Sequence, residues 1–158
     1  MASAQTVMEI MQSWIDKGKL TNNNFDKFIC YWIAFNCYYA NKTQIYGAER
    51  KMIHALKNDN ECVDMFKEIY KNGAYSHLFA KLIEISPVYE NIPNSNKNSS
   101  KLKKISFANI IETLYLVRCN LFHGSKAQEK DRDIEVIAAA APILELIVEK
   151  FCSNFPNL

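Results

Sequence analysis

The sequence contains few residues that break helices, because only four glycines and four prolines occur among its 158 residues. Strict alternation of apolar and polar residues, which is typical of strands, is also missing. Apolar residues instead recur three and four positions apart over most of the chain. We therefore predict an all-α fold, a compact bundle of about five to seven helices in a single domain covering residues 1–158.

Long apolar runs are absent as well. A membrane-spanning helix needs roughly 18 consecutive apolar residues, and the sequence has no such segment. The first residues, MASAQTVMEIMQ, include an acidic residue early and lead to no cleavage site of the kind that follows a secretory signal. These features predict a soluble, cytoplasmic protein without a membrane partner.

The cysteines form no recognisable framework. Their number is odd and no two are spaced as C-x-x-C, so the sequence predicts neither a disulfide scaffold nor a zinc site. We expect reduced and mostly buried thiols, with no metal and no cofactor. The five positions are Cys30, Cys37, Cys62, Cys119 and Cys152.

The chain also lacks a large excess of either charge, since its formal net charge is only +2. So small a value does not indicate a nucleic-acid partner, and any RNA-binding surface has to be a local cluster of basic residues. Lysines 97, 101, 103 and 104 form one candidate cluster, although a solvated loop is the favoured interpretation of such a run. Apolar residues make up 49% of the chain and aromatic residues 12%, which predicts a well-packed core rich in rings.

Helix boundaries follow from periodicity and from capping residues, and the segment TNNN, residues 21–24, supplies N-cap candidates for the second helix. The chain between the fifth and sixth expected helices, 86–101, is rich in Asn, Ser and Pro and reads as a loop. Gly18, Gly73 and Gly124 are expected to stop helices. The expected helices cover residues 4–17, 25–40, 48–58, two shorter segments within 61–73 and 75–86, then 103–123 and 133–155.

The second expected helix carries an aromatic stripe formed by Phe25, Phe28, Trp32 and Phe35. Core packing explains such a stripe far more often than base stacking does. Asn36 interrupts it. We interpret Asn36 as a structural amide inside the bundle, and the alternative is that it lines a cleft near His123.

The segment YLVRCNLFHGSK, residues 115–126, places Arg118 five residues before His123 and a glycine directly after the histidine. A histidine titrates near neutrality and can transfer a proton, with a typical rate gain of about 10²- to 10⁴-fold. The planar guanidinium of arginine matches phosphate oxygens and stabilises the charge that develops on them. From the residues alone, the favoured interpretation is a helix end with two basic side chains near the C-terminal dipole.

A helical wheel sets Arg118 at the edge of the core and His123 on a mixed face shared with Asn109, Glu112, Leu116, Cys119 and Asn120. Such a face is typical of an interface, since its apolar members gain from burial. Two-fold pairing would bring two arginines and two histidines to one cleft. The sequence therefore favours a homodimer.

The segment VRCNLFHG resembles the HEPN superfamily signature, an arginine followed after four to six residues by a histidine, and FDKFICYWIAFNCYY is similar to the aromatic helix that precedes it. The resemblance implies a homodimeric helical bundle with a metal-independent endoribonuclease site between the subunits. It also implies RNA as the substrate, 2',3'-cyclic phosphate and 5'-hydroxyl ends, and a role as a toxin or defence effector. Such proteins are often restrained by a nucleotidyltransferase-type antitoxin.

Carried over to this chain, the resemblance gives Arg118 and His123 the catalytic roles. The family commonly has Asn, Asp or His directly after the arginine, where this chain has Cys119, and Asn120 is the substitute for positioning. A thiol is a weak hydrogen-bonding group. This departure motivates a second hypothesis, a non-catalytic module of the same fold that binds a nucleotide or a protein. His54 and His77 lack a comparably placed arginine and are expected on helix surfaces.

Overall fold

A computed structural model describes residues 2–86, 88, 102, 104–122 and 131–155 of the chain. These residues form seven α-helices and one 3₁₀ turn, with no strand, which confirms the all-α prediction for the described part. The helices are α1 (Ala4–Leu20), α2 (Asn24–Thr43), α3 (Glu49–Lys57), α4 (Asn60–Lys71), α5 (Ser76–Ile85), α6 (Phe107–Phe122) and α7 (Asp131–Ser153), and the 3₁₀ turn η1 covers Gly73–Tyr75.

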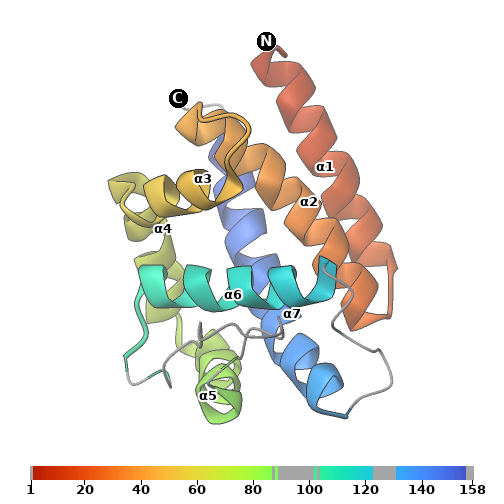
Figure 1. Cartoon of the computed structure of the whole chain (residues 1–158), viewed down its shortest axis with the longest axis vertical. Helices are drawn as coiled ribbons and strands as arrows, with labels where there is room; N and C mark the ends of the chain where they lie inside the picture. Colours follow the sequence, from red (N-terminus) through yellow and green to blue (C-terminus); the bar gives the residue numbers. More distant parts are fainter. Residues whose placement is uncertain (1, 87, 89–101, 103, 123–130, 156–158) are drawn as a thin grey trace.

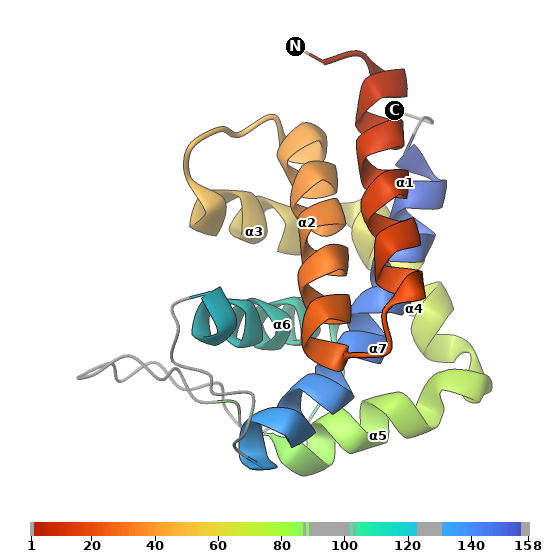
Figure 2. The same ribbon diagram turned by 90° about the vertical axis from the view of Figure 1, so that its right-hand side faces the viewer.

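The helices are arranged around α7. Helices α1 and α2 form an antiparallel pair, and α7 packs against both of them as well as against α4, α5 and α6 (Figures 1 and 2). Helix α6 crosses in front of α7 at a large angle in Figure 1, and the short helix α3 packs on α6. This arrangement places the C-terminal half of α2, the start of α3 and the motif-bearing helix α6 in one region.

Aromatic side chains from three helices meet at Phe151 of α7. Its ring centroid lies 5.4 Å from that of Tyr38, 6.3 Å from that of Phe35 and 5.7 Å from that of Phe107. All four rings are buried. The aromatic stripe predicted on α2 is likewise buried, which confirms its assignment to the core; its members are Phe25, Phe28, Trp32 and Phe35.

Helix starts follow the expected capping chemistry. The Oδ1 of Asn23 accepts a hydrogen bond of 2.8 Å from the backbone N–H of Phe25, so the polar segment before α2 supplies its N-cap as predicted. Helix α6 begins at Phe107, later than the predicted residue 103. The Oγ of Ser106 accepts from the backbone N–H of Asn109 at 3.2 Å, and this cap fixes the start that the apolar pattern alone placed too early.

Gly18 does not stop the first helix, so that prediction is wrong. Helix α1 continues to Leu20 and Gly18 is buried within it. A Cβ atom at position 18 would lie 2.9 Å from Cε2 of Tyr31 and 3.3 Å from Cβ of Cys30. The glycine therefore allows close approach of α1 to α2, and its role is packing rather than termination.

The remaining boundaries agree with the sequence to within a few residues. Gly73 separates α4 from α5 as predicted, and α7 continues through Pro142. The predicted loop 86–101 lies outside the described residues except for Ser86 and Val88. Of the lysines considered for RNA binding, only Lys104 is described, and it is exposed.

The cysteines are all free, and Cys30, Cys62 and Cys119 are buried while the other two are half-buried, as predicted.

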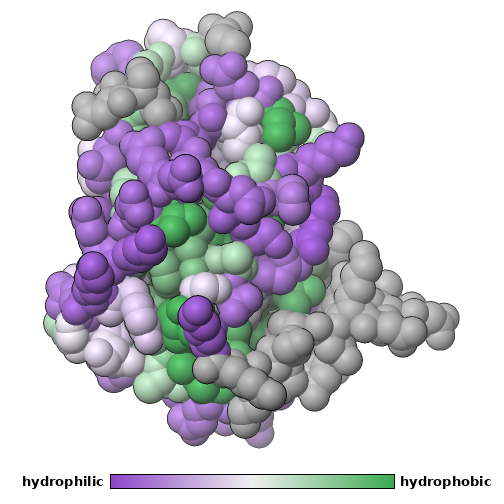
Figure 3. All heavy atoms as spheres, turned by 90° about the vertical axis from the view of Figure 1, so that its left-hand side faces the viewer, coloured by the Kyte–Doolittle hydropathy of each residue, from purple (hydrophilic) through white to green (hydrophobic). Residues whose placement is uncertain are grey.

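No described helix combines the length and apolar character that crossing a bilayer requires. The face on the left of Figure 1 carries a broad hydrophilic area and a hydrophobic strip that runs through it to the lower end (Figure 3).

Candidate functional site

Arg118 lies in the last turns of α6 and reaches the first residue of α3. Its Nη2 is 2.9 Å from Oε2 of Glu49, and the two side chains keep 23% and 22% of their surface exposed. The guanidinium also lies over the ring of Phe122, 5.0 Å from its centroid. Arg118 is therefore held at the edge of the core, as the helical wheel predicted, and a minor part of its side chain faces solvent.

A hydrogen-bonded chain fixes Glu49 from the other side. The hydroxyl of Tyr39 donates to Oε1 of Glu49 at 2.6 Å, and Nδ2 of Asn36 donates to the Tyr39 hydroxyl at 2.7 Å. Each carboxylate oxygen of Glu49 thus has its own donor, Tyr39 or Arg118. The network joins α2, α3 and α6 and orients the guanidinium.

Burial raises the pKa of Tyr39 above its ordinary value of 10, and the carboxylate of Glu49 acts in the same direction, although the amide of Asn36 and the charge of Arg118 oppose it. The phenol therefore stays protonated and acts as a donor to Glu49.

The burial of Asn36 differs from the expectation. This residue is exposed and not enclosed in the bundle, so its interpretation as an interior amide is wrong. The C-terminal half of α2 lies at the surface on this side, and the amide supports the Tyr39 hydroxyl from there. Asn36 is thereby connected to Arg118 through Tyr39 and Glu49. The alternative, in which Asn36 lines a cleft near His123, concerns a residue outside the described part of the chain.

A second cluster of charges lies six residues earlier along α6, at Glu112. Glu112 accepts from Arg50 at 2.7 Å and from Lys57 at 2.9 Å, and both cations come from α3. The guanidinium of Arg50 lies 5.1 Å from the centroid of the Tyr115 ring. Burial acts to raise the pKa of Glu112, but the hydrogen bonds from Arg50 and Lys57 outweigh it and lower that pKa below its ordinary value.

The interface face predicted around His123 is largely covered by the chain itself. Asn120 is only 1% exposed and Cys119 only 7%, and Leu116 is buried too, so the expectation that this face is free to meet a second copy is wrong. Helix α6 is enclosed on that side within the bundle. Cys119 lies beside the hydroxyl of Tyr115, and burial, with Cys119 adding to it, raises the pKa of Tyr115 to about 12.

The accessible side of α6 is instead the one that carries Arg118. Residues three and four apart share one side of a helix, and Glu112, Tyr115, Arg118 and Phe122 follow that spacing. The first three are half-buried and Phe122 is 48% exposed. We call these four residues the open stripe of α6.

His123 and Gly124 lie outside the described residues, which end at Phe122 before resuming at Asp131. The described part therefore places Arg118, Cys119 and Asn120 of the four predicted site residues, and brings only Arg118 to the surface. His54 and His77 are both exposed on helices, as predicted.

Sequence reasoning missed Tyr39, Glu49 and Arg50. The only local signal is the three-residue spacing of Asn36 and Tyr39, which puts both on one side of a helix. Nothing in the sequence pairs Glu49 with Arg118, because their contact depends on how α3 packs against α6.

Within the described ranges, no group of three or more His, Cys, Asp or Glu side chains is placed to hold a metal ion. Cationic side chains outnumber the carboxylates that they contact at this site. Arg50, Lys57 and Arg118 face two carboxylates, and their guanidinium and ammonium groups are the groups that bind phosphate oxygens. The Nε–H of Arg118 is buried and has no acceptor among the described residues.

Comparison of the chain with models of protein families, with curated proteins and with solved structures gave no match.

Proposed function

We propose that this chain is a metal-independent endoribonuclease of the HEPN type, with a composite site of Arg118 and His123 from two copies of the chain. The observation that carries the proposal is the placement of Arg118. Its side chain keeps 23% of its surface exposed at the end of α6, Glu49 orients it, and it stands five residues before His123 in the sequence. A guanidinium held in this way can bind the phosphate of a nucleic acid without a large loss of side-chain entropy.

The oriented ion pair suits this role. The contact with Glu49 uses the Nη2 end of the fork, while Tyr39 holds the other oxygen of the carboxylate. A phosphate that reaches the exposed part of the fork meets a group whose direction is already fixed. The buried Nε–H of Arg118 has no acceptor among the described residues, which lowers the stability of the fold. A purely structural ion pair would not require this loss of stability.

In the proposed reaction, the ribose 2'-hydroxyl attacks the adjacent phosphorus and loses its proton to a neutral His123. The bond from phosphorus to the 5'-oxygen breaks, and this oxygen takes a proton from a protonated His123 of the second copy. Arg118 stabilises the charge that grows on the non-bridging oxygens. The products are a 2',3'-cyclic phosphate and a 5'-hydroxyl, and no metal takes part.

The two copies would meet along the open stripe of α6, because Leu116, Cys119 and Asn120 on the face predicted around His123 are buried. Phe122 exposes nearly half of its surface there and lies against Arg118. Burial of an exposed aromatic ring contributes to association, and aromatic and arginine residues are frequent at interface centres. A homodimer in the cytoplasm that acts as a toxin, restrained by a nucleotidyltransferase-type antitoxin, would fit this activity.

The test is cleavage of single-stranded RNA in EDTA by the wild type and by Arg118→Ala, Arg118→Lys and His123→Ala. His77→Ala is the matched control, since it removes an exposed histidine from α5. We expect His123→Ala to lose activity by about 10²-fold or more, Arg118→Lys to lose less than Arg118→Ala, and the control to keep full activity. Equal activity in all five proteins would remove the proposal.

The composite character needs a separate experiment. Wild-type subunits and Arg118→Ala/His123→Ala double-variant subunits are co-expressed with different tags and the mixed species is isolated. If one cleft draws on both copies, the mixed dimer loses nearly all activity, because only one of the two required histidines remains. A mixed dimer that keeps about half of the wild-type activity would contradict a shared site and support a site within one chain.

A second function is favoured by one observation. Cys119 and Asn120 are buried, so neither reaches the solvent-facing side of Arg118. The chain would then be a non-catalytic module that binds a nucleotide or a protein through the open stripe. Retained affinity for nucleotide in a protein that never cleaves RNA would support it over the nuclease.

A further inference from the structure

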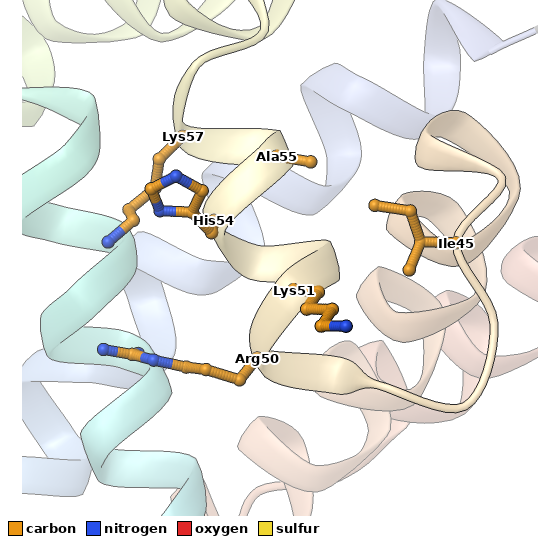
Figure 4. A pocket seen from close by; sticks show the side chains of 6 residues that line it. All are labelled: Ile45, Arg50, Lys51, His54, Ala55 and Lys57. Carbon is orange, nitrogen blue, oxygen red and sulfur yellow. The ribbon is translucent and has the colours of Figure 1, made fainter.

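A pocket of about 440 Å³ lies beside α3, apart from the open stripe. One wall is Ile45, in the connection between α2 and α3, and the others are side chains of α3, namely Arg50, Lys51, His54, Ala55 and Lys57. Figure 4 shows Arg50 and Lys57 pointing toward α6, while Lys51 extends on the side of Ile45. Four of the six lining residues carry nitrogen donors, and no lining residue is acidic.

The basic groups of this pocket are only partly neutralised. Arg50 and Lys57 share one carboxylate, that of Glu112. Lys51 and His54 are exposed, and no hydrogen bond or ion pair holds either side chain within the described part of the chain. The pocket therefore combines a concave shape with donors that are free to bind an anion.

Arg50 connects the pocket with the open stripe, because it lines the pocket and its guanidinium lies over the ring of Tyr115. Glu49, which holds Arg118, precedes Arg50 in α3, and Arg50 lies over the ring of Tyr115, three residues before Arg118 in α6. An RNA strand with one phosphate at Arg118 would therefore pass Arg50 next and then reach the pocket. These cations lie on two packed helices, α3 and α6, and a polynucleotide backbone is bound by several basic side chains in succession.

We infer that this pocket binds the backbone phosphates of the RNA strand next to the linkage that is cleaved, with Lys51 and His54 as the donors. The inference rests on the proposed function and specifies where its substrate lies. Phosphate oxygens of a free nucleotide would satisfy the same donors, but a polynucleotide also explains why cations extend from Arg118 through Arg50 to the pocket.

The experiment measures binding of a fluorescent, mixed-sequence RNA whose 2'-hydroxyls are all methylated, so that cleavage by the attacking hydroxyl is blocked. Fluorescence anisotropy is recorded against salt concentration for the wild type, Lys51→Ala and Lys51→Ala/His54→Ala. The control is Lys81→Ala/His77→Ala, a matched pair of exposed basic residues on α5. ATP serves as a second ligand.

Losing one phosphate contact to a single strand reduces the slope of log affinity against log salt by about 0.7, which corresponds to about a fivefold loss of affinity at 0.1 M salt. We expect that loss for Lys51→Ala, a larger one for the double variant and none for the control. Unchanged affinity and slope in both α3 variants would overturn the inference. So would Lys51-dependent binding of ATP without any binding of the RNA.

The two proposals fail in different ways. If the wild type and Arg118→Ala cleave unmodified RNA equally while Lys51→Ala weakens binding of the methylated RNA, the nuclease assignment fails and the binding pocket stands. If cleavage depends on Arg118 and His123 while the α3 variants bind like the wild type, the pocket fails and the nuclease stands.

Discussion

Replacement of Gly18 by alanine tests the packing of α1 on α2. The new methyl group would lie 2.9 Å from Cε2 and 3.0 Å from Cδ2 of Tyr31. That ring has no room to move, because Tyr31 is fully buried and its hydroxyl donates to Glu145 at 3.3 Å and to Glu149 at 3.0 Å. The substitution therefore forces either a shift of α1 or a distortion of the ring.

Two opposing effects set the magnitude. Alanine is more favourable than glycine inside a helix by about 1 kcal/mol, and the helix is continuous through position 18. Overpacking a close contact costs about 1–3 kcal/mol. We expect the overpacking to win, so that Gly18→Ala lowers the free energy of unfolding by about 1 kcal/mol and the melting temperature by about 2–4 °C.

Urea denaturation followed by circular dichroism measures this change, and Gly73→Ala is the matched control. A Cβ at Gly73 would meet no heavy atom within 4 Å, and its φ lies outside the left-handed region. Gly73→Ala should be neutral or should stabilise by about 0.5 kcal/mol. If Gly18→Ala proved as stable as Gly73→Ala, the contact between α1 and Tyr31 would not be as close as described, and the reasoning would be refuted.

Three further predictions concern side chains of the site and the core. Tyr39→Phe should lower the free energy of unfolding by about 1 kcal/mol in urea denaturation, because Glu49 loses a donor, and an unchanged midpoint would contradict the network. Glu112→Gln should lower the free energy of unfolding at neutral pH. The folded pKa of Glu112 lies below its ordinary value of 4.5, so its ion pairs stabilise the fold fully above pH 4.5, and this stabilisation is lost as the pH falls through the folded pKa. The difference from wild type should therefore shrink in acid, and a constant difference would exclude this cause. Burial raises the pKa of Cys62 and of Cys152 to about 12, so both thiols should react with a thiol reagent much more slowly in the folded protein than in urea; equal rates would contradict their burial.

Local signals explain how much of the fold could be predicted from the sequence. The period of the apolar residues indicated every helix, and Asn23 marked the start of α2 because capping acts within a few residues. Gly18 was misjudged for the same reason. A glycine that ends a helix and one that admits a neighbouring ring look alike in sequence, and only the position of Tyr31 distinguishes them.

The candidate site was predicted in part. The position of Arg118 at the edge of the core followed from the helical wheel, since it depends on one helix alone. The burial of Asn120 and the exposure of Asn36 did not follow, because they depend on which sides of α6 and α2 other helices cover.

The sequence by itself determined that the chain is helical and placed an arginine and a histidine five residues apart, because periodicity and spacing are properties of adjacent residues. Only the tertiary structure brought Glu49 and Tyr39 to Arg118, left the Arg118 side of α6 accessible and gathered Arg50, Lys51, His54 and Lys57 around one pocket. These contacts join segments far apart in the chain, and they form because burying the apolar sides of α2, α6 and α7 fixes how the helices cross.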